Sequence, residues 1–228
     1  MAPQETALTI RRNFKRADAG ILRQFSQVPT GNVCDSQGRT GALDYRIKPV
    51  SAAAAFCGTA LTVDAGPRDN LAAWTALEVA RPGDVILIRT GEFCDSSVVG
   101  DIYVGMARNA GVVAIVTDGA VRDIPGIDAV GIPVFAIGVS PNSPWKNGPG
   151  RVGLPIAIGG VTVDAGDIVV GDQDGVVIVP RAGAAAAADE LTSVLAKEAK
   201  MEQGVKAGLT VPAWLADARK AKGVTYVE

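Results

Sequence analysis

Four short runs of consecutive apolar residues stand out along the chain. They cover residues 85–88, 112–116, 134–137 and 176–179, and valine and isoleucine occur in all of them. Continuous apolar runs of this length are typical of strands that are buried on both faces, as in a sheet covered by further layers. The pattern therefore predicts a sheet at the centre of the molecule.

Two helical patterns lie between these runs, each with a polar residue that can cap its first turn. Asp69-Asn70 can start a helix that Arg81-Pro82-Gly83 would stop. Asp101 can start a second helix, which Gly111 would end in a left-handed conformation. Strands that alternate with helices indicate an α/β architecture.

The pattern changes after Gly138. Residues 139–153 are rich in proline, glycine and asparagine, and they predict a long ordered loop. Short apolar segments separated by glycines follow, and these predict tight hairpins. Because hairpins make part of a sheet antiparallel, we expect a single α/β domain over 1–228, with a mixed central sheet flanked by helices. A helical segment at about 15–28 and an alanine-rich C-terminal helix at about 182–203 are expected near its two ends.

The charge balance narrows the range of partners. The chain has 22 basic and 24 acidic residues, whereas a nucleic-acid surface usually needs a basic excess. Neither a signal peptide nor an apolar segment long enough to span a bilayer is recognisable. Cys34, Cys57 and Cys94 are sparse and odd in number, which favours buried free thiols in a reducing compartment. We therefore expect a cytoplasmic protein that binds neither nucleic acid nor membranes.

The absence of histidine limits the possible chemistry. It excludes a Ser-His-Asp triad, zinc held by histidines and a phosphohistidine carrier. A metal site would have to rest on carboxylates and water, which favour Mg²⁺ or Mn²⁺ over zinc.

The residues best placed for such a site are two acids and an arginine. Asp101 is separated by twenty residues from the adjacent pair Arg122-Asp123. If a helix and a strand run out and back between them, these side chains meet where the amides of Ile102 and Tyr103 can bind an anion. Taken singly, the residues have a simpler explanation as a helix cap and a surface ion pair, which contributes only about 0–1 kcal/mol.

Longer segments of the chain resemble a known family. The signature of the 4-hydroxy-4-methyl-2-oxoglutarate aldolases is similar to GDIYVGMARNAGVVAIVTDGAVRDIPGI at 100–127. These proteins are class II pyruvate aldolases that share a fold with regulator of ribonuclease activity A. The resemblance extends over nearly the whole chain through GNVCDSQGR at 31–39, the segment 69–88 and GDIVVGDQDGVVIVPR at 166–181. It implies the swivelling β/β/α fold of that family.

The resemblance implies a role for each residue of the motif. Asp123 would bind the metal directly, and Asp101 would hold a metal-bound water. Arg122 would contact the oxo and carboxylate oxygens of the substrate and stabilise the enolate. The backbone amides of Ile102 and Tyr103 would receive the pyruvate carboxylate.

The resemblance also implies a contribution from a second copy of the chain. The family uses a glutamate from the C-terminal helix of a neighbouring subunit, which corresponds to Glu198 here, with Glu202 as the alternative. A homotrimer or homohexamer is therefore expected. Many relatives have a histidine where this chain has Trp74, and that difference either changes the substrate or the activity or reflects a core tryptophan on the helix face. Asp35 and Arg39 lie in another recurrent family segment and are assigned only a supporting role.

The implied function is that of a lyase. With Mg²⁺ or Mn²⁺ it would cleave a 4-hydroxy-2-oxo acid or diacid to pyruvate and a second carbonyl product, and it would also decarboxylate oxaloacetate. Its expected partners are a small-molecule 2-oxo acid and further copies of the chain. The alternative is a non-catalytic ring-shaped binding protein that resembles regulator of ribonuclease activity A.

Overall fold

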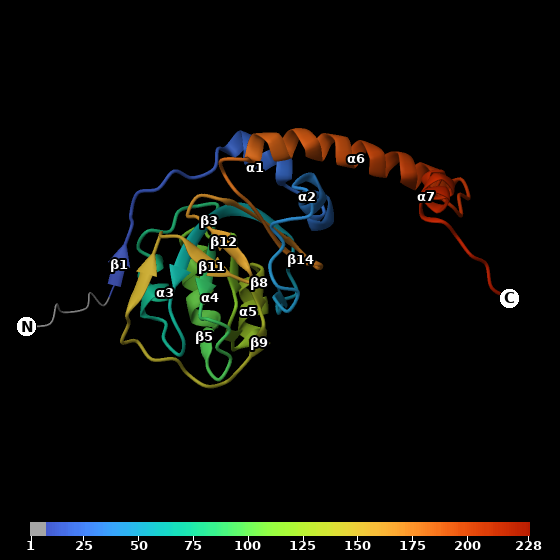
Figure 1. The fold of residues 1–228 in the computed structure, drawn as a ribbon. Coiled ribbons are helices and arrows are strands. Elements are labelled where there is room, and N and C mark those ends of the chain that lie inside the picture. The colour runs from blue at the N-terminus through green and yellow to red at the C-terminus, as the bar shows by residue number, and fades with distance from the viewer. Residues whose placement is uncertain (1–7) are drawn as a thin grey trace, which may run out of the picture.

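A nine-stranded mixed sheet forms the centre of the computed structural model, which describes residues 8–228 (Figure 1). In order across the sheet, its main path consists of β1 (Leu8–Ile10), β10 (Gly150–Val152), β3 (Phe56–Asp64), β4 (Asp84–Arg89), β6 (Ala114–Thr117), β8 (Val134–Ala136) and β2 (Lys48–Pro49). Strands β3, β4, β6 and β8 run parallel to one another. A hairpin pairs antiparallel with β3 and consists of β13 (Ile168–Asp172) and β14 (Gly175–Val179). The expected α/β fold with a mixed sheet is therefore confirmed.

Helices and two smaller sheets surround this sheet. The helices are α1 (Ala19–Phe25), α2 (Thr30–Ser36), α3 (Leu71–Ala76), α4 (Asp101–Asn109), α5 (Ile124–Val130), α6 (Ala184–Lys206) and α7 (Trp214–Lys222). The smaller sheets consist of the pair β11 (Ile156–Ile158) and β12 (Val161–Val163), and of β5 (Ser97–Val99), β7 (Ala120–Val121) and β9 (Gly138–Val139).

The four apolar runs are confirmed as strands, and burial on both faces explains their composition. On one face, Ile86 and Ile115 are fully buried in a core shared with α3, α4 and α5. On the other face, Leu87 and Val116 are fully buried in a core shared with β11 and β12. Because successive side chains of a strand point to opposite faces, both alternating sets have to be apolar.

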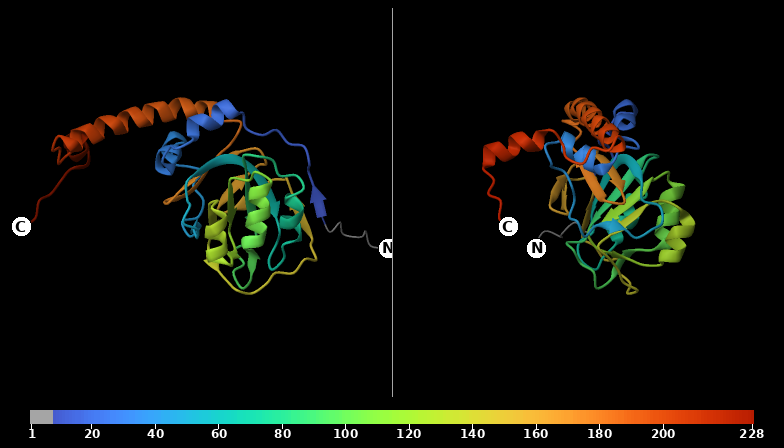
Figure 2. Two further views of the ribbon diagram at one scale, coloured as in Figure 1. Left: turned by 180° about the vertical axis from the view of Figure 1, so that it is seen from behind. Right: turned by 90° about the vertical axis from the view of Figure 1, so that its right-hand side faces the viewer.

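Helices α1, α2 and α6 form a further layer against the β13–β14 hairpin, with a core of their own. The buried residues of α6 all lie on one face of its first two turns, and Leu191 is the last of them. Beyond it, the helix extends away from the rest of the protein and leads to α7, which has no buried residue (Figures 1 and 2). Glu198 still contacts Asn32 of α2, and the residues that follow it in α6 present their side chains outside the body of their own chain.

The small sheet of β5, β7 and β9 lies beyond the carboxyl ends of the central strands. Each of its strands follows a central strand along the chain: β5 comes after β4, β7 after β6, and β9 after β8. All three are parallel to one another, so the segments beyond the carboxyl ends of the central strands are gathered together. Ligand sites of α/β proteins are found at this end of a sheet.

The expectation of buried thiols is wrong. The three cysteines, Cys34, Cys57 and Cys94, are free, but each is only partly buried. Cys34 lies in α2, Cys57 lies near the start of β3, and Cys94 lies in the loop after β4. Burial nevertheless raises the pKa of Cys57 to about 11. Its thiol is therefore protonated and poorly nucleophilic at neutral pH.

Between residues 8 and 228, no helix has both the length and the apolar character that crossing a membrane requires.

A buried ion pair connects the N-terminal segment to the sheet. The Asp84 side chain is fully buried at the start of β4 and accepts two hydrogen bonds of 2.8 Å from the Arg16 guanidinium. We expect Arg16→Ala to lower the free energy of unfolding by about 3–5 kcal/mol, because it leaves a buried carboxylate without its cation. Urea unfolding at neutral pH measures this difference.

The matched control is Arg46→Ala. Arg46 also forms ion pairs, with Asp44 and Glu92, but they lie at the surface. Surface pairs contribute little to stability, so this variant should unfold close to the wild-type denaturant concentration. Equal destabilisation by the two substitutions would contradict the special role of the Arg16–Asp84 pair.

Candidate active site

The helix–strand unit between Asp101 and Asp123 runs out and back, as its sequence predicts. Helix α4 begins at Asp101, and the chain returns through β6 and β7. The Arg122 amide then donates a hydrogen bond of 3.1 Å to the Val99 carbonyl, next to the start of α4. Two acids and an arginine that are twenty residues apart in sequence are thereby brought to one place.

Two glycines allow this close approach. A Cβ atom at Gly100 would lie 2.5 Å from Asp123 Oδ2, and one at Gly126 would lie 2.6 Å from the Asp101 Cβ. Real side-chain atoms cannot approach so closely, hence both positions need a residue without a side chain. The glycines therefore give the two carboxylates their places beside α4 and α5.

Asp123 has a left-handed backbone conformation, with φ 62° and ψ 43°, immediately before α5. Residues other than glycine seldom adopt this conformation, although aspartate tolerates it better than most. Such conformations are enriched at functional sites, where the surrounding structure imposes them. Here the conformation accompanies the contact of the Asp123 carboxylate with the start of α4.

Arg122 is held at two points. Its Nη1 donates a hydrogen bond of 2.6 Å to the Ser143 hydroxyl, and its Nε lies 3.2 Å from Asp123 Oδ2. A guanidinium has five N–H donors in one plane, so further donors are available to a ligand. The side chain is thus a preoriented anion-binding group.

These residues line a cavity of about 120 Å³. It is large enough for a small organic acid, since a cavity measured by the space open to a water-sized sphere needs only about 10–15 Å³ to hold one water molecule. Its lining includes all the residues expected from the motif, namely Asp101, Ile102, Tyr103, Arg122 and Asp123. It also includes four polar residues that the sequence did not single out as site residues: Asn70, Ser97, Ser143 and Lys146.

The start of α4 differs from the expectation in one detail. The Ile102 amide donates a hydrogen bond of 2.7 Å to the carboxylate of Asp101. A substrate carboxylate that binds the Ile102 amide would have to replace this contact. The positive end of the helix dipole still favours an anion at this place.

The donor set of the cavity fits a hard divalent cation. Asp101 and Asp123 supply carboxylate oxygens, and Mg²⁺ is commonly bound by one or two carboxylates, with water in its other positions. Within residues 8–228, no three histidine, cysteine, aspartate or glutamate side chains are grouped so that they could hold a metal ion. A third carboxylate would therefore have to come from another chain.

Helix α3 forms a wall of the cavity through Asn70 and Trp74. Asn70 does not cap α3 with its side chain; its Nδ2 donates a hydrogen bond of 2.8 Å to the Val98 carbonyl. The Trp74 ring packs edge-to-face on Tyr103, with ring centroids 5.2 Å apart. Burial raises the pKa of Tyr103, whose protonated hydroxyl donates to the Ala73 carbonyl, so its side chain holds α3 and α4 together.

The loop after β9 forms another side of the cavity, through Ser143 and Lys146. Its backbone is attached to the start of α3: the Asn147 amide donates to Asp69 Oδ2 over 2.7 Å, and the Asn70 amide donates to the Trp145 carbonyl over 3.0 Å. The sequence predicts this loop as ordered, but it contains no signal that the loop reaches the motif around Asp101.

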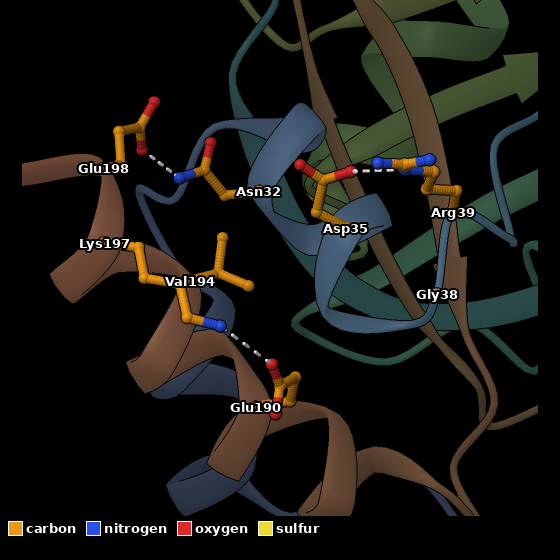
Figure 3. A pocket seen from close by; sticks show the side chains of 8 residues that line it. All are labelled: Asn32, Asp35, Gly38, Arg39, Glu190, Val194, Lys197 and Glu198. Carbon is orange, nitrogen blue, oxygen red and sulfur yellow. Dashed lines mark hydrogen bonds and ion pairs between the residues drawn. The ribbon is translucent and has the colours of Figure 1, made fainter. Parts of the chain in front are cut away.

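Glu198 lies elsewhere in its own chain. It accepts a hydrogen bond from Asn32 of α2 and lines a different cavity, of about 700 Å³, together with Asp35 and Arg39 (Figure 3). Glu202 is one turn further along α6, and its Oε2 lies 3.9 Å from Lys206 Nζ. Neither glutamate lines the cavity of Asp101 and Asp123 within the same chain.

Known proteins are similar to the chain over most of its length. A family model described as "RraA-like: Aldolase/RraA" matches residues 30–178. A curated protein of Halalkalibacterium halodurans, named "Putative 4-hydroxy-4-methyl-2-oxoglutarate aldolase", is 37% identical over 168 residues, which are 74% of this chain and 80% of that protein.

Two solved structures extend the similarity to the fold. The RNA-processing inhibitor RraA from Thermus thermophilis has a TM-score of 0.63 and 27% identity, over 68% of this chain and 93% of its own. RraAS2 of Streptomyces coelicolor, an unusual member of the RNase ES inhibitor RraA protein family, has a TM-score of 0.74 and 26% identity, over 82% of this chain and 99% of its own.

Proposed function

Because the chain belongs to the RraA-like family (Aldolase/RraA), we propose that it is a divalent-metal-dependent lyase. It cleaves a 4-hydroxy-2-oxo acid or diacid to pyruvate and a second carbonyl product, and it also decarboxylates oxaloacetate. The observation that carries this proposal is the convergence of Asp101, Arg122 and Asp123 on one small cavity at the start of α4.

The anion-binding part of the cavity suits a 2-oxo acid. The preoriented Arg122 guanidinium binds the carboxylate and the 2-oxo oxygen, and planar two-point recognition of this kind is characteristic of arginine. The amides at the start of α4 offer a second place for the carboxylate. Lys146, which also lines the cavity, adds positive charge for a substrate with two carboxylates.

The carboxylates of the cavity would hold the cation. Asp123 would bind Mg²⁺ or Mn²⁺ directly, and Asp101 would bind it through a water molecule. When bound, the cation supplies Lewis acidity that polarises the 2-oxo group and offsets the negative charge of an enolate.

The third carboxylate is that of Glu198 in a second copy of the chain, within a homotrimer or homohexamer. This assignment is supported by the course of α6, which carries Glu198 beyond its last fully buried residue, Leu191, and away from the chain's own cavity. A helix that leaves the body of its chain is suited to reach a neighbour.

Both reactions pass through the enolate of pyruvate. In the cleavage, the C4 hydroxyl loses its proton, the C3–C4 bond breaks, and its electron pair remains on C3. In oxaloacetate the same bond breaks, and C4 leaves as carbon dioxide. Arg122 stabilises the negative charge that develops on the enolate oxygen, since its guanidinium is already oriented there.

The proposal is tested by pyruvate release from 4-hydroxy-4-methyl-2-oxoglutarate and from oxaloacetate, with Mg²⁺, with Mn²⁺ and with EDTA. Both substrates should be turned over with either metal, and EDTA should stop turnover until excess metal is added. A protein-free reaction corrects for the spontaneous decarboxylation of oxaloacetate.

The competing function is that of a non-catalytic binding protein, and the similarity to the two RraA structures supports it. Docking on a partner does not require two acids and an arginine around a cavity, whereas the lyase does. If neither substrate is turned over above the protein-free rate, the binding function is favoured and the lyase is excluded for these substrates.

A further inference from the structure

Two polar atoms on the α3 wall of the cavity are buried without a hydrogen-bond partner: Asn70 Oδ1 and Trp74 Nε1. Asn70 is only 5% exposed. Buried polar atoms in folded proteins almost always have a partner, because losing contact with water otherwise costs free energy. Their occurrence together at a cavity indicates that a bound molecule supplies the missing partners.

The chemistry of each atom is unambiguous. The Asn70 amide is oriented by its Nδ2 bond of 2.8 Å to the Val98 carbonyl, so its remaining polar atom is an acceptor. The indole nitrogen of Trp74 can only donate. Asn70 directly precedes α3, Trp74 is in the first turns of that helix, and both line the cavity. The wall therefore offers one donor and one acceptor.

We propose that Trp74 Nε1 donates a hydrogen bond to the oxygen on C4 of a bound 4-hydroxy-2-oxo acid. This inference rests on the proposed function and assigns a contact to the part of the substrate beyond the pyruvyl group. Arg122 and the start of α4 take the carboxylate and the 2-oxo group, and Trp74, which lines the same cavity of about 120 Å³, is left for the part of the substrate beyond them. Asn70 Oδ1 accepts a hydrogen bond from a donor of the bound substrate or its water.

The contact stabilises the charge that develops during the cleavage. The C4 hydroxyl proton passes to water, the C4 oxygen becomes negative and then forms the carbonyl of the second product, and the C3–C4 electron pair remains on C3. A donor aimed at this oxygen is strongest when the negative charge is largest. Trp74 therefore lowers the barrier to cleavage.

Decarboxylation of oxaloacetate changes the charge in the opposite sense. There C4 belongs to a carboxylate, whose negative charge moves away as carbon dioxide forms. A donor to this carboxylate stabilises the substrate more than the transition state, and such binding does not accelerate the reaction. The two reactions should thus respond differently to the loss of the indole N–H.

Trp74→Phe removes the N–H but keeps an aromatic ring to pack on Tyr103. We expect the ratio of kcat for 4-hydroxy-4-methyl-2-oxoglutarate cleavage to kcat for oxaloacetate decarboxylation to fall about tenfold. Trp214→Phe, on the exposed helix α7, is the matched control and should leave the ratio unchanged. If Trp74→Phe lowers both rates by the same factor, or neither, Trp74 only packs and the inference is overturned.

A second measurement does not depend on turnover. The indole N–H signal of Trp74, identified in nitrogen–proton correlation spectra by its loss in Trp74→Phe, should shift further with 4-hydroxy-4-methyl-2-oxoglutarate than with pyruvate, which has no C4. Equal shifts would mean that the indole binds only water, and they would overturn the inference. Absence of turnover in the wild-type protein would refute the proposed lyase, while a selective shift would still support the contact.

Discussion

Arg122→Ala should lower kcat/KM for both aldol cleavage and oxaloacetate decarboxylation by about 1000-fold, the effect of removing a principal donor to a developing oxyanion. The reason is that both reactions share the pyruvate enolate, and Arg122 is the guanidinium that lines the cavity. Its contacts with Ser143 and Asp123 orient it before the substrate binds. Initial rates of pyruvate formation, with both substrates and saturating metal, measure the effect.

Two arginine variants make this experiment specific. Arg122→Lys keeps the positive charge but loses the planar pair of donors, so it should restore only a small part of the activity. Arg151→Ala removes an exposed arginine that pairs with Asp64 outside the cavity, and it should retain wild-type rates. Intact decarboxylation in Arg122→Ala would show that Arg122 does not stabilise the enolate.

Glu198→Gln should lower kcat/KM by about 100-fold, since it removes the charge of the proposed third carboxylate at the metal. Glu198 is exposed on α6, so the substitution should leave the fold intact. Glu202→Gln, one turn further along the same helix, is the matched control and should remain active. The opposite result would assign the role to Glu202.

Mixed assemblies then test whether the glutamate comes from a second copy of the chain. Arg122→Ala and Glu198→Gln should each be nearly inactive alone, but their coexpression should restore activity to about a quarter of the wild-type value, because random pairing leaves one site in four with both native residues. No recovery in assemblies that contain both variants would contradict a shared site.

Much of the fold follows from local sequence patterns. The apolar runs at 85–88, 112–116, 134–137 and 176–179 predict strands because burial on both faces leaves little room for polar residues. Strand β3 has no such signal, although it lies in the middle of the sheet. It contains Thr59 and Thr62, and the hydroxyl of the fully buried Thr62 donates to the carbonyl of Leu154, a partner remote in the sequence.

The candidate site likewise contains some residues that the sequence reveals and others whose role depends on tertiary packing. Asp101, Arg122 and Asp123 are recognisable from the sequence through the family resemblance, since their spacing alone is explained as well by a helix cap and a surface ion pair. Asn70 was expected only as a helix cap, whereas its side chain bonds to Val98 and its oxygen remains without a partner. That difference depends on the hydrogen bond between Asn70 and β5, two segments whose meeting no local pattern specifies.

The sequence by itself determined four of the buried strands, the carboxylate chemistry imposed by the lack of histidine, and the motif around Asp101. Only the tertiary structure decided that α3 and the loop carrying Ser143 enclose the same cavity, and that α6 carries Glu198 away from it. The physical reason is the sequence distance over which the two kinds of feature arise. Strand and helix signals arise between neighbouring residues, whereas a cavity is formed by segments whose contacts depend on the packing of the whole chain.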